Sequence, residues 1–363
     1  MDGHGSGERT RRKGRGALTN PHVRFESLQR EAVDDGWGSL EAPLPPLRTE
    51  VGIDTARRVL AWNDSPDVPF DRSINPYRGC EHGCIYCFAR PSHAYYGLSP
   101  GQDFESRLLR KVDAAKRLEE ELRAPGYRPA PITLGANTDP YQPIEKRYRV
   151  TREILEVLAE HRHPVSIVTK GTLIERDLGL LSDMARWNGA AVMVSVTSLD
   201  ASIKRTLEPR AASPARRLQV IERLVGAGVP VGTLVAPVIP AITDHEIERI
   251  LAATANAGAE SAGYVLLRLP REVQPLFVEW LDSHYPDRRE HVLSLLRQSH
   301  HGSCYDAAFS HRQRGDGAYA DMIARRFAVA CRKAGIDPAR RITLSSDQFH
   351  PPSRVGDQLG LFG

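Results

Sequence analysis

The chain has 363 residues, of which 41% are hydrophobic, 26% charged and 7% aromatic, and this composition is typical of a globular protein with one large domain or two smaller ones. No apolar run approaches the length of a membrane span, and the first twenty residues hold no hydrophobic stretch like a signal peptide, so we expect a cytoplasmic protein. Five cysteines, three of them clustered, do not suit a secreted disulfide framework, and favour a metal or cluster site in a reducing compartment.

The net charge of +4 is only mildly basic, but arginine supplies most of it. Only seven of the 49 basic residues are lysine. Arginine binds phosphates through a bidentate fork and stacks on bases, which suits a nucleic-acid ligand. A solvated arginine-rich surface explains the same composition, and a charge of this size leaves both interpretations open.

The N-terminal part of the chain has little that could form a core. Residues 1–20 are rich in glycine and arginine and predict a disordered basic tail. Residues 21–72 form an irregular N-terminal extension, in which residues 49–65 have the pattern of a short hairpin.

From residue 73 the pattern becomes regular. A strand that ends at the cysteines is followed by an amphipathic helix over 103–124, and five further strands then alternate with five helices. The strands are expected at 131–139, 164–170, 190–198, 230–240 and 261–270, and the helices at 151–162, 173–187, 214–228, 243–258 and 273–285. Because the strands are continuous apolar runs, they predict a parallel sheet covered by helices, either doubly wound or an incomplete barrel.

This α/β core is expected to span 73–285. Beyond it, residues 286–345 hold two more helical stretches and form a C-terminal extension, and residues 346–363 form a tail rich in turn residues. The two extensions at either end of the core are candidates to cover the open side of an incomplete barrel.

The most informative motif is the run "NPYRGCEHGCIYCFARP" at 75–91. It places Cys80, Cys84 and Cys87 just after the first strand, at the end of a parallel sheet where ligands bind. A structural zinc ion usually takes four ligands, whereas three thiolates on a four-iron cluster leave one iron open. A zinc site completed by His82, Cys304, or one of His300 and His301 remains the alternative, and would make the chain a non-catalytic interaction protein.

The C-x3-C-x2-C spacing, with Tyr86 before the last cysteine, resembles the radical S-adenosylmethionine (SAM) enzymes from about residue 73 to 270. The resemblance implies a partial (β/α)6 parallel barrel and a [4Fe–4S] cluster on Cys80, Cys84 and Cys87. It also implies that SAM binds the open iron and is cleaved reductively to a 5′-deoxyadenosyl radical. An external electron donor such as flavodoxin or ferredoxin is then required, since no flavin site or second cluster motif is evident.

Polar residues follow the predicted strands in succession. Thr138 and Asp139 end the second strand, Lys170 the third, and Ser195 the fourth, where SAM would lie. Arg210 is expected to pair with Glu208 near the same end of the barrel. The apolar residues at 235–240 are expected to pack on the adenine of SAM. Strand-end residues of these types are also common as simple rim or capping groups.

The motifs "CIYCFA", "TDPYQPIE" and "EPRAASPARRL" resemble the subgroup that includes spore photoproduct lyase and proteins labelled DNA repair photolyases. The resemblance implies Tyr86, Phe88, Lys170 and Ser195 as SAM contacts and nucleic acid as the leading substrate class, with a small molecule or protein as the alternative. The lyase has a hydrogen-donating cysteine at the end of the second strand, where this chain has Asn137. We therefore do not expect the thymine-dimer lyase reaction, and no catalytic residue is assigned.

The chain ends in "QLGLF". Gln358, Leu359, Leu361 and Phe362 match the peptide by which many bacterial replication and repair proteins dock on the sliding clamp. Leu361 and Phe362 suit an apolar pocket on the clamp. The alternative is that these residues pack on the chain's own barrel.

Overall fold

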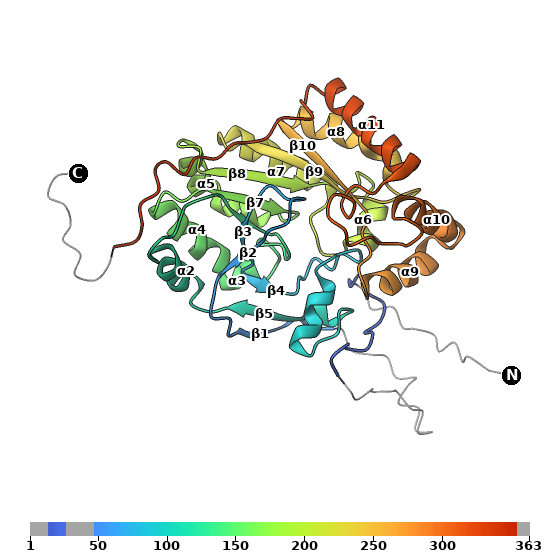
Figure 1. The fold of residues 1–363 in the computed structure, drawn as a ribbon, viewed down its shortest axis with the longest axis horizontal. Helices are drawn as coiled ribbons and strands as arrows, with labels where there is room; N and C mark the ends of the chain where they lie inside the picture. Colours follow the sequence, from blue (N-terminus) through green and yellow to red (C-terminus); the bar gives the residue numbers. More distant parts are fainter. Residues whose placement is uncertain (1–13, 27–46, 354–363) are drawn as a thin grey trace.

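The computed structural model describes residues 14–26 and 47–353, and its centre is a seven-stranded sheet (Figure 1). The strands lie in the order β10-β9-β8-β7-β6-β3-β2, and all are parallel except β2, which pairs antiparallel with β3 at the edge. Their bounds are β2 Leu60–Trp62, β3 Arg72–Ile74, β6 Ile132–Leu134, β7 Val165–Thr169, β8 Ala190–Ser195, β9 Val231–Val238 and β10 Ser261–Leu266. The predicted partial (β/α)6 barrel is confirmed.

Helices cover the outside of the sheet because each has one apolar face, which packs on the buried strands. Ser213 caps one of them, α7, by accepting a hydrogen bond from Arg216 N, and Pro214 follows as its first residue. The helices around the core are α2 Ala114–Leu122, α3 Glu145–Tyr148, α4 Val150–Glu160, α5 Leu178–Ala185, α6 Ala201–Leu207, α7 Pro214–Gly226, α8 Ile247–Asn256 and α9 Val273–His284, followed by α10 Arg289–Ser299 and α11 Gly317–Lys333. Short 3₁₀ turns η1 Arg90–Tyr96, η2 Leu173–Asp177, η3 Asp244–Glu246 and η4 Pro286–Arg288 join them.

Two local predictions were wrong, because strands paired with distant partners. The expected helix over 103–124 is instead α1 Asp103–Ser106, strand β5 Arg107–Lys111 and α2, with Asp113 at a positive φ of 56° before α2. The expected hairpin at 49–65 does not form, since β1 Glu50–Asp54 pairs parallel with β5 while β2 pairs with β3. Together with β4 Tyr77–Arg78, β1 and β5 form a separate three-stranded sheet.

The last part of the predicted disordered tail, residues 14–20, is packed against the rest of the protein. Residues 14–20 pack against the loop that carries the cysteines, because the buried carboxylate of Glu105 accepts hydrogen bonds from the backbone N–H groups of Gly16 and Ala17. Arg15 also donates to the carbonyl of Glu105 at 2.6 Å. The part of the predicted tail before residue 14 lies outside the described residues.

Residues 334–353 form an extended C-terminal strap that crosses the molecule after α11 (Figure 1). Ser345 N donates to Asn188 O just before β8, and His350 N donates to His161 O just before β7. The strap therefore runs along the side where the parallel strands begin, opposite the mouth where they end. In the two described ranges, no helix is long and apolar enough to cross a membrane.

Candidate active site

The three cysteines lie on a tightly held loop at the mouth of the barrel. Cys80 N donates to Phe104 O at 2.8 Å. The buried side-chain amide of Gln142 makes two hydrogen bonds to the same loop. It accepts from Glu81 N at 2.9 Å and donates to Gly79 O at 3.1 Å. Gly79 has a positive φ of 71°, which favours glycine at this turn.

Glycine is also required where the loop meets the N-terminal segment. A Cβ atom on Gly16 would come within 1.9 Å of the carbonyl oxygen of Gly83, so only glycine allows this approach. The loop is thus held by contacts from both distant and neighbouring parts of the chain.

The thiols of Cys80, Cys84 and Cys87 interact electrostatically with one another inside the protein. Burial raises the pKa of all three thiols, and the charges of Cys84 and Cys87 raise the pKa of Cys80 further. The pKa of Cys84 is raised to about 12 by burial and by Glu208, against the lowering effect of Lys170. Cys80 and Cys84 are buried and Cys87 is partly exposed, so a positively charged group among the three would be needed to keep them as thiolates.

The spread of the donors does not suit a single zinc ion. Sulfur atoms around one tetrahedral zinc lie about 3.8 Å apart, given Zn–S bonds of about 2.3 Å. Over the described ranges, three donor atoms all within 4.8 Å of one another occur only at His301, His311 and Asp316, so at least two of the three cysteine sulfur atoms lie farther apart than 4.8 Å. This separation is wider than a single zinc ion requires.

Each of the predicted extra zinc ligands has its own contacts. His82 Nδ1 lies 3.3 Å from the carboxylate of Asp139, and Cys304 is buried in the apolar cluster that also contains Cys84 and Tyr86. His300 is buried, and its burial lowers the pKa of its ring.

Asp139, which follows β6, contacts both the end of β7 and the cysteine loop through its carboxylate. Its carboxylate accepts hydrogen bonds from Thr169 Oγ1 at 2.7 Å and from Lys170 N at 2.6 Å, and it faces His82. Burial raises the pKa of Asp139, but the charge of His82 and these hydrogen bonds outweigh it and lower the pKa to about 2. Thr138 is similarly engaged, since its hydroxyl donates to Tyr77 O at 2.9 Å.

A second polar network lies behind Tyr86. The buried carboxylate of Glu208 accepts hydrogen bonds from the Tyr86 hydroxyl, from Thr197 Oγ1 at 2.8 Å, and from Arg217. Arg217 also donates to the carbonyl of Ser195, the last residue of β8, at 3.0 Å. This network holds the end of β8 against the cysteine loop.

The expected pair of Glu208 with Arg210 was wrong. Arg210 instead forms an ion pair with Glu81 at 3.1 Å, on the outer side of the cysteine loop. Arg217 was missed because it lies within the regular pattern of α7, where only its complete burial marks it as unusual for arginine.

The structure brings most of the other predicted SAM contacts to this mouth. Lys170 Nζ lies 5.9 Å from the centre of the Tyr86 ring, and Ser195 is buried at the end of β8. Phe88 is 42% exposed beside the loop, with the guanidinium of Arg268 4.4 Å from its ring centre. Ile239, from the run expected to face adenine, is buried in the same apolar cluster as Cys84 and Tyr86.

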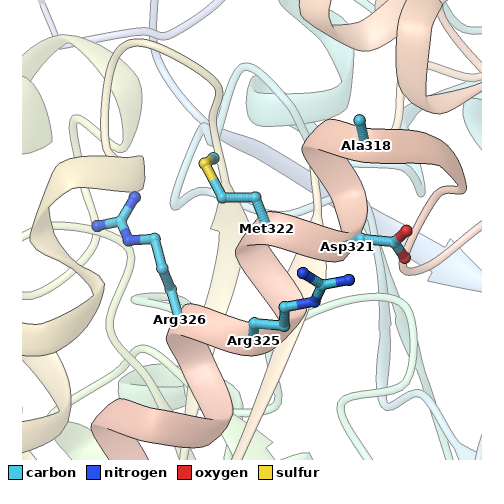
Figure 2. A pocket seen from close by; sticks show the side chains of 5 residues that line it. All are labelled: Ala318, Asp321, Met322, Arg325 and Arg326. Atoms are coloured by element: carbon cyan, nitrogen blue, oxygen red, sulfur yellow. The ribbon is translucent and has the colours of Figure 1, made fainter.

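The remaining predicted residues, Gln358, Leu359, Leu361 and Phe362, lie outside the described part of the chain. A shallow pocket on α11 contains none of the predicted site residues (Figure 2). It is lined by Ala318, Asp321, Met322, Arg325 and Arg326.

Comparison with known proteins gives matches that include the cysteine loop and the strands around it. The profile of the Radical SAM superfamily matches residues 74–253. An uncharacterized protein of Mycobacterium tuberculosis is 38% identical over 233 residues, which cover 64% of this chain and 68% of that protein. An uncharacterized protein of Methanocaldococcus jannaschii is 26% identical over 218 residues, covering 60% and 77% of the two chains.

Among solved structures, a spore photoproduct lyase complexed with dinucleoside spore photoproduct has a similar fold. The TM-score is 0.53 at 15% sequence identity, over 78% of this chain and 77% of that chain. At this identity the likeness concerns the fold.

Proposed function

Since this chain belongs to the radical SAM superfamily, we propose that Cys80, Cys84 and Cys87 hold a [4Fe–4S] cluster and that the enzyme acts on nucleic acid. When bound, the cluster supplies the electron that cleaves SAM to methionine and a 5′-deoxyadenosyl radical, which abstracts hydrogen from the substrate. The buried, mutually interacting thiols on one tightly held loop are the observation that supports the cluster.

The residues around the loop divide into two roles in this proposal. Lys170, Ser195 and Tyr86 line the mouth and contact SAM, with Lys170 as the cation for its carboxylate, while Phe88 lies exposed beside them. Thr138, Asp139 and Arg210, which are engaged in hydrogen bonds or ion pairs within the protein, act mainly by positioning the loop and the strand ends.

A nucleic-acid substrate is supported by how the exposed aromatic side chains are arranged. The described ranges expose six aromatic side chains, and five of them have an arginine guanidinium near the ring. The sixth, Tyr95, stacks on Phe25, with the two ring centres 5.3 Å apart. Aromatic rings interleaved with arginines form the surfaces on which unpaired bases stack. The pairs are Arg24 with Phe25 (5.2 Å), Arg72 with Trp62 (4.6 Å), Arg268 with Phe88 (4.4 Å), Arg78 with Tyr96 (5.7 Å) and Arg312 with Phe309 (4.7 Å).

The decisive experiment is electron paramagnetic resonance of the anaerobically reconstituted, dithionite-reduced protein. We expect a [4Fe–4S]⁺ signal whose shape changes when SAM is added. The Cys84→Ala variant should lose this signal, whereas Cys331→Ala, which removes a buried thiol on α11, should keep it. A colourless protein that binds zinc and gives no signal would contradict the proposal.

We further propose an external one-electron donor of the flavodoxin or ferredoxin type, because the sequence contains only one cluster motif. Reduced flavodoxin should replace dithionite in supporting SAM cleavage. If neither flavodoxin nor ferredoxin supports cleavage while dithionite does, this part of the proposal is wrong.

The C-terminal peptide with Gln358, Leu359, Leu361 and Phe362 is proposed to dock on a bacterial sliding clamp. The match of these four residues to the docking peptide supports this proposal. The last described residues lie on the side where the strands begin, since Pro352 O accepts a hydrogen bond from Arg123 Nε at 3.2 Å. Purified sliding clamp should retain the full chain but not a chain without its last six residues, and equal retention of both would exclude docking.

A further inference from the structure

Arg268 differs from the other arginines around the mouth because no carboxylate of the described residues pairs with it. Arg90, Arg217 and Arg312 form ion pairs with buried carboxylates. Within the described part of the chain, Arg268 has no hydrogen bond and no ion pair, and its guanidinium lies over the ring of Phe88, 4.4 Å from the ring centre. Arg268 lies two residues after the end of β10, so it is at the side where the parallel strands end.

The surroundings of Arg268 leave a positive charge without a full counter-charge. Burial lowers the pKa of Arg268, and the charges of Tyr305, Asp67 and Cys87 oppose this effect. Asp67 is already engaged, because its carboxylate accepts from Ser310 N at 2.6 Å and from Arg312 Nε. An arginine side chain stays protonated, and a partly buried charge is costly until an anion pairs with it.

We propose that Arg268 binds a phosphodiester group of the substrate strand and that Phe88 stacks on a neighbouring base. The guanidinium fork matches two phosphate oxygens, and base stacking requires an exposed ring, which Phe88 has. This inference rests on the proposed nucleic-acid substrate and assigns the contact that brings the strand to Phe88, the residue that follows Cys87.

The test measures binding of a fluorescein-labelled single-stranded thymidine oligonucleotide to the anaerobically reconstituted full chain over a series of salt concentrations. Arg268→Gln should raise the Kd by about tenfold and reduce the salt slope by about 1, because one phosphate contact is lost. Arg268→Lys should recover part of the affinity, since it restores the charge but not the fork. The control is Arg325→Gln on α11, which removes the same charge away from the mouth and should bind like the unchanged protein (Figure 2).

Four outcomes would overturn the inference. Equal binding by Arg268→Gln and the unchanged protein would show that Arg268 makes no phosphate contact. An equal loss in Arg325→Gln would show only an effect of net charge. If SAM no longer changes the electron paramagnetic resonance signal of Arg268→Gln and Arg268→Lys, Arg268 contacts SAM and not a phosphate of the strand. Failure of the unchanged protein to bind the oligonucleotide would refute the nucleic-acid substrate itself, and this outcome is distinguishable from the other three.

Discussion

At the scale of single residues, Glu208 is the connecting group of the site. It is hydrogen-bonded to Tyr86 of the cysteine loop, to Thr197 just after strand β8, and to Arg217 of helix α7. Burial raises the pKa of Glu208, but the charges of Arg217 and Lys170 and the hydrogen bonds outweigh burial and lower the pKa to about 2. Glu208 therefore remains ionised near neutral pH and can neutralise the buried Arg217.

Replacing Glu208 should destabilise the protein strongly. Glu208→Gln leaves Arg217 buried without its counter-ion, and removing one partner of a buried pair costs roughly 3–5 kcal/mol of the free energy of unfolding. Urea denaturation of the variant and of Glu222→Gln, on the exposed face of α7, would measure this loss. A loss no larger than that of Glu222→Gln would show that the pair does not stabilise the fold.

At the scale of elements, the C-terminal strap covers histidines at the side where the strands begin. The ring of Phe349 lies 5.3 Å from the ring of His163, and His161 contacts His350 at 5.4 Å. His163 Nε2 is 2.8 Å from the hydroxyl of Tyr127. Burial lowers the pKa of His163 to about 4 from the ordinary 6.5.

This pKa predicts acid sensitivity. Between pH 6.5 and about 4 the unfolded chain binds a proton at His163 that the folded chain excludes, so the free energy of unfolding falls as the pH is lowered. The contribution is at most about 1.4 kcal/mol per pH unit and about 3 kcal/mol in all. His163→Gln should therefore show a shallower decline in stability, measured by denaturation at several pH values.

The matched control for this experiment is His245→Gln, which changes an exposed histidine before α8. It should follow the pH dependence of the unchanged protein. The same slope in His163→Gln and His245→Gln would refute the assignment of the acid sensitivity to His163.

At the scale of the whole molecule, the open sheet is closed by two loops. Leu266 N, at the β10 edge, donates to Gln313 O at 2.8 Å. Arg312, one residue away, donates to Asp67 and to Ser65 in the loop that follows β2 at the other edge. Ion pairing and hydrogen bonding thus connect the two edge strands beside the mouth, so part of the C-terminal extension does cover the open side.

Asp67→Asn should loosen this closure. The carboxylate of Asp67 is almost fully buried, so its loss weakens the bonds to Arg312 and should raise amide exchange of residues 303–316 by about tenfold. Hydrogen exchange followed by mass spectrometry would measure the change. Asp183→Asn, in an exposed pair with Arg186, is the control and should leave these residues unaffected. Unchanged exchange in Asp67→Asn would show that the closure does not depend on this pair.

The local pattern was sufficient for the barrel strands and for the loop with Cys80, Cys84 and Cys87, because apolar runs and cysteine spacing are properties of neighbouring residues. The same reasoning failed for β5, whose residues 107–111 fit a helical pattern until β1 and β4 supply strand partners. The spacing of apolar residues in the sequence indicates which face of an element is buried. It does not indicate which strand pairs with the backbone of that element.

The sequence by itself therefore determined the architecture, the superfamily and the cysteine ligands proposed for the cluster. Only the tertiary structure decided which charges meet: Glu208 with Arg217 rather than Arg210, and Asp67 with Arg312, while Arg268 pairs with no carboxylate in the described part of the chain. The physical reason is that an ion pair depends on distance in space and on burial. The folded chain sets both, through contacts between residues far apart in the sequence.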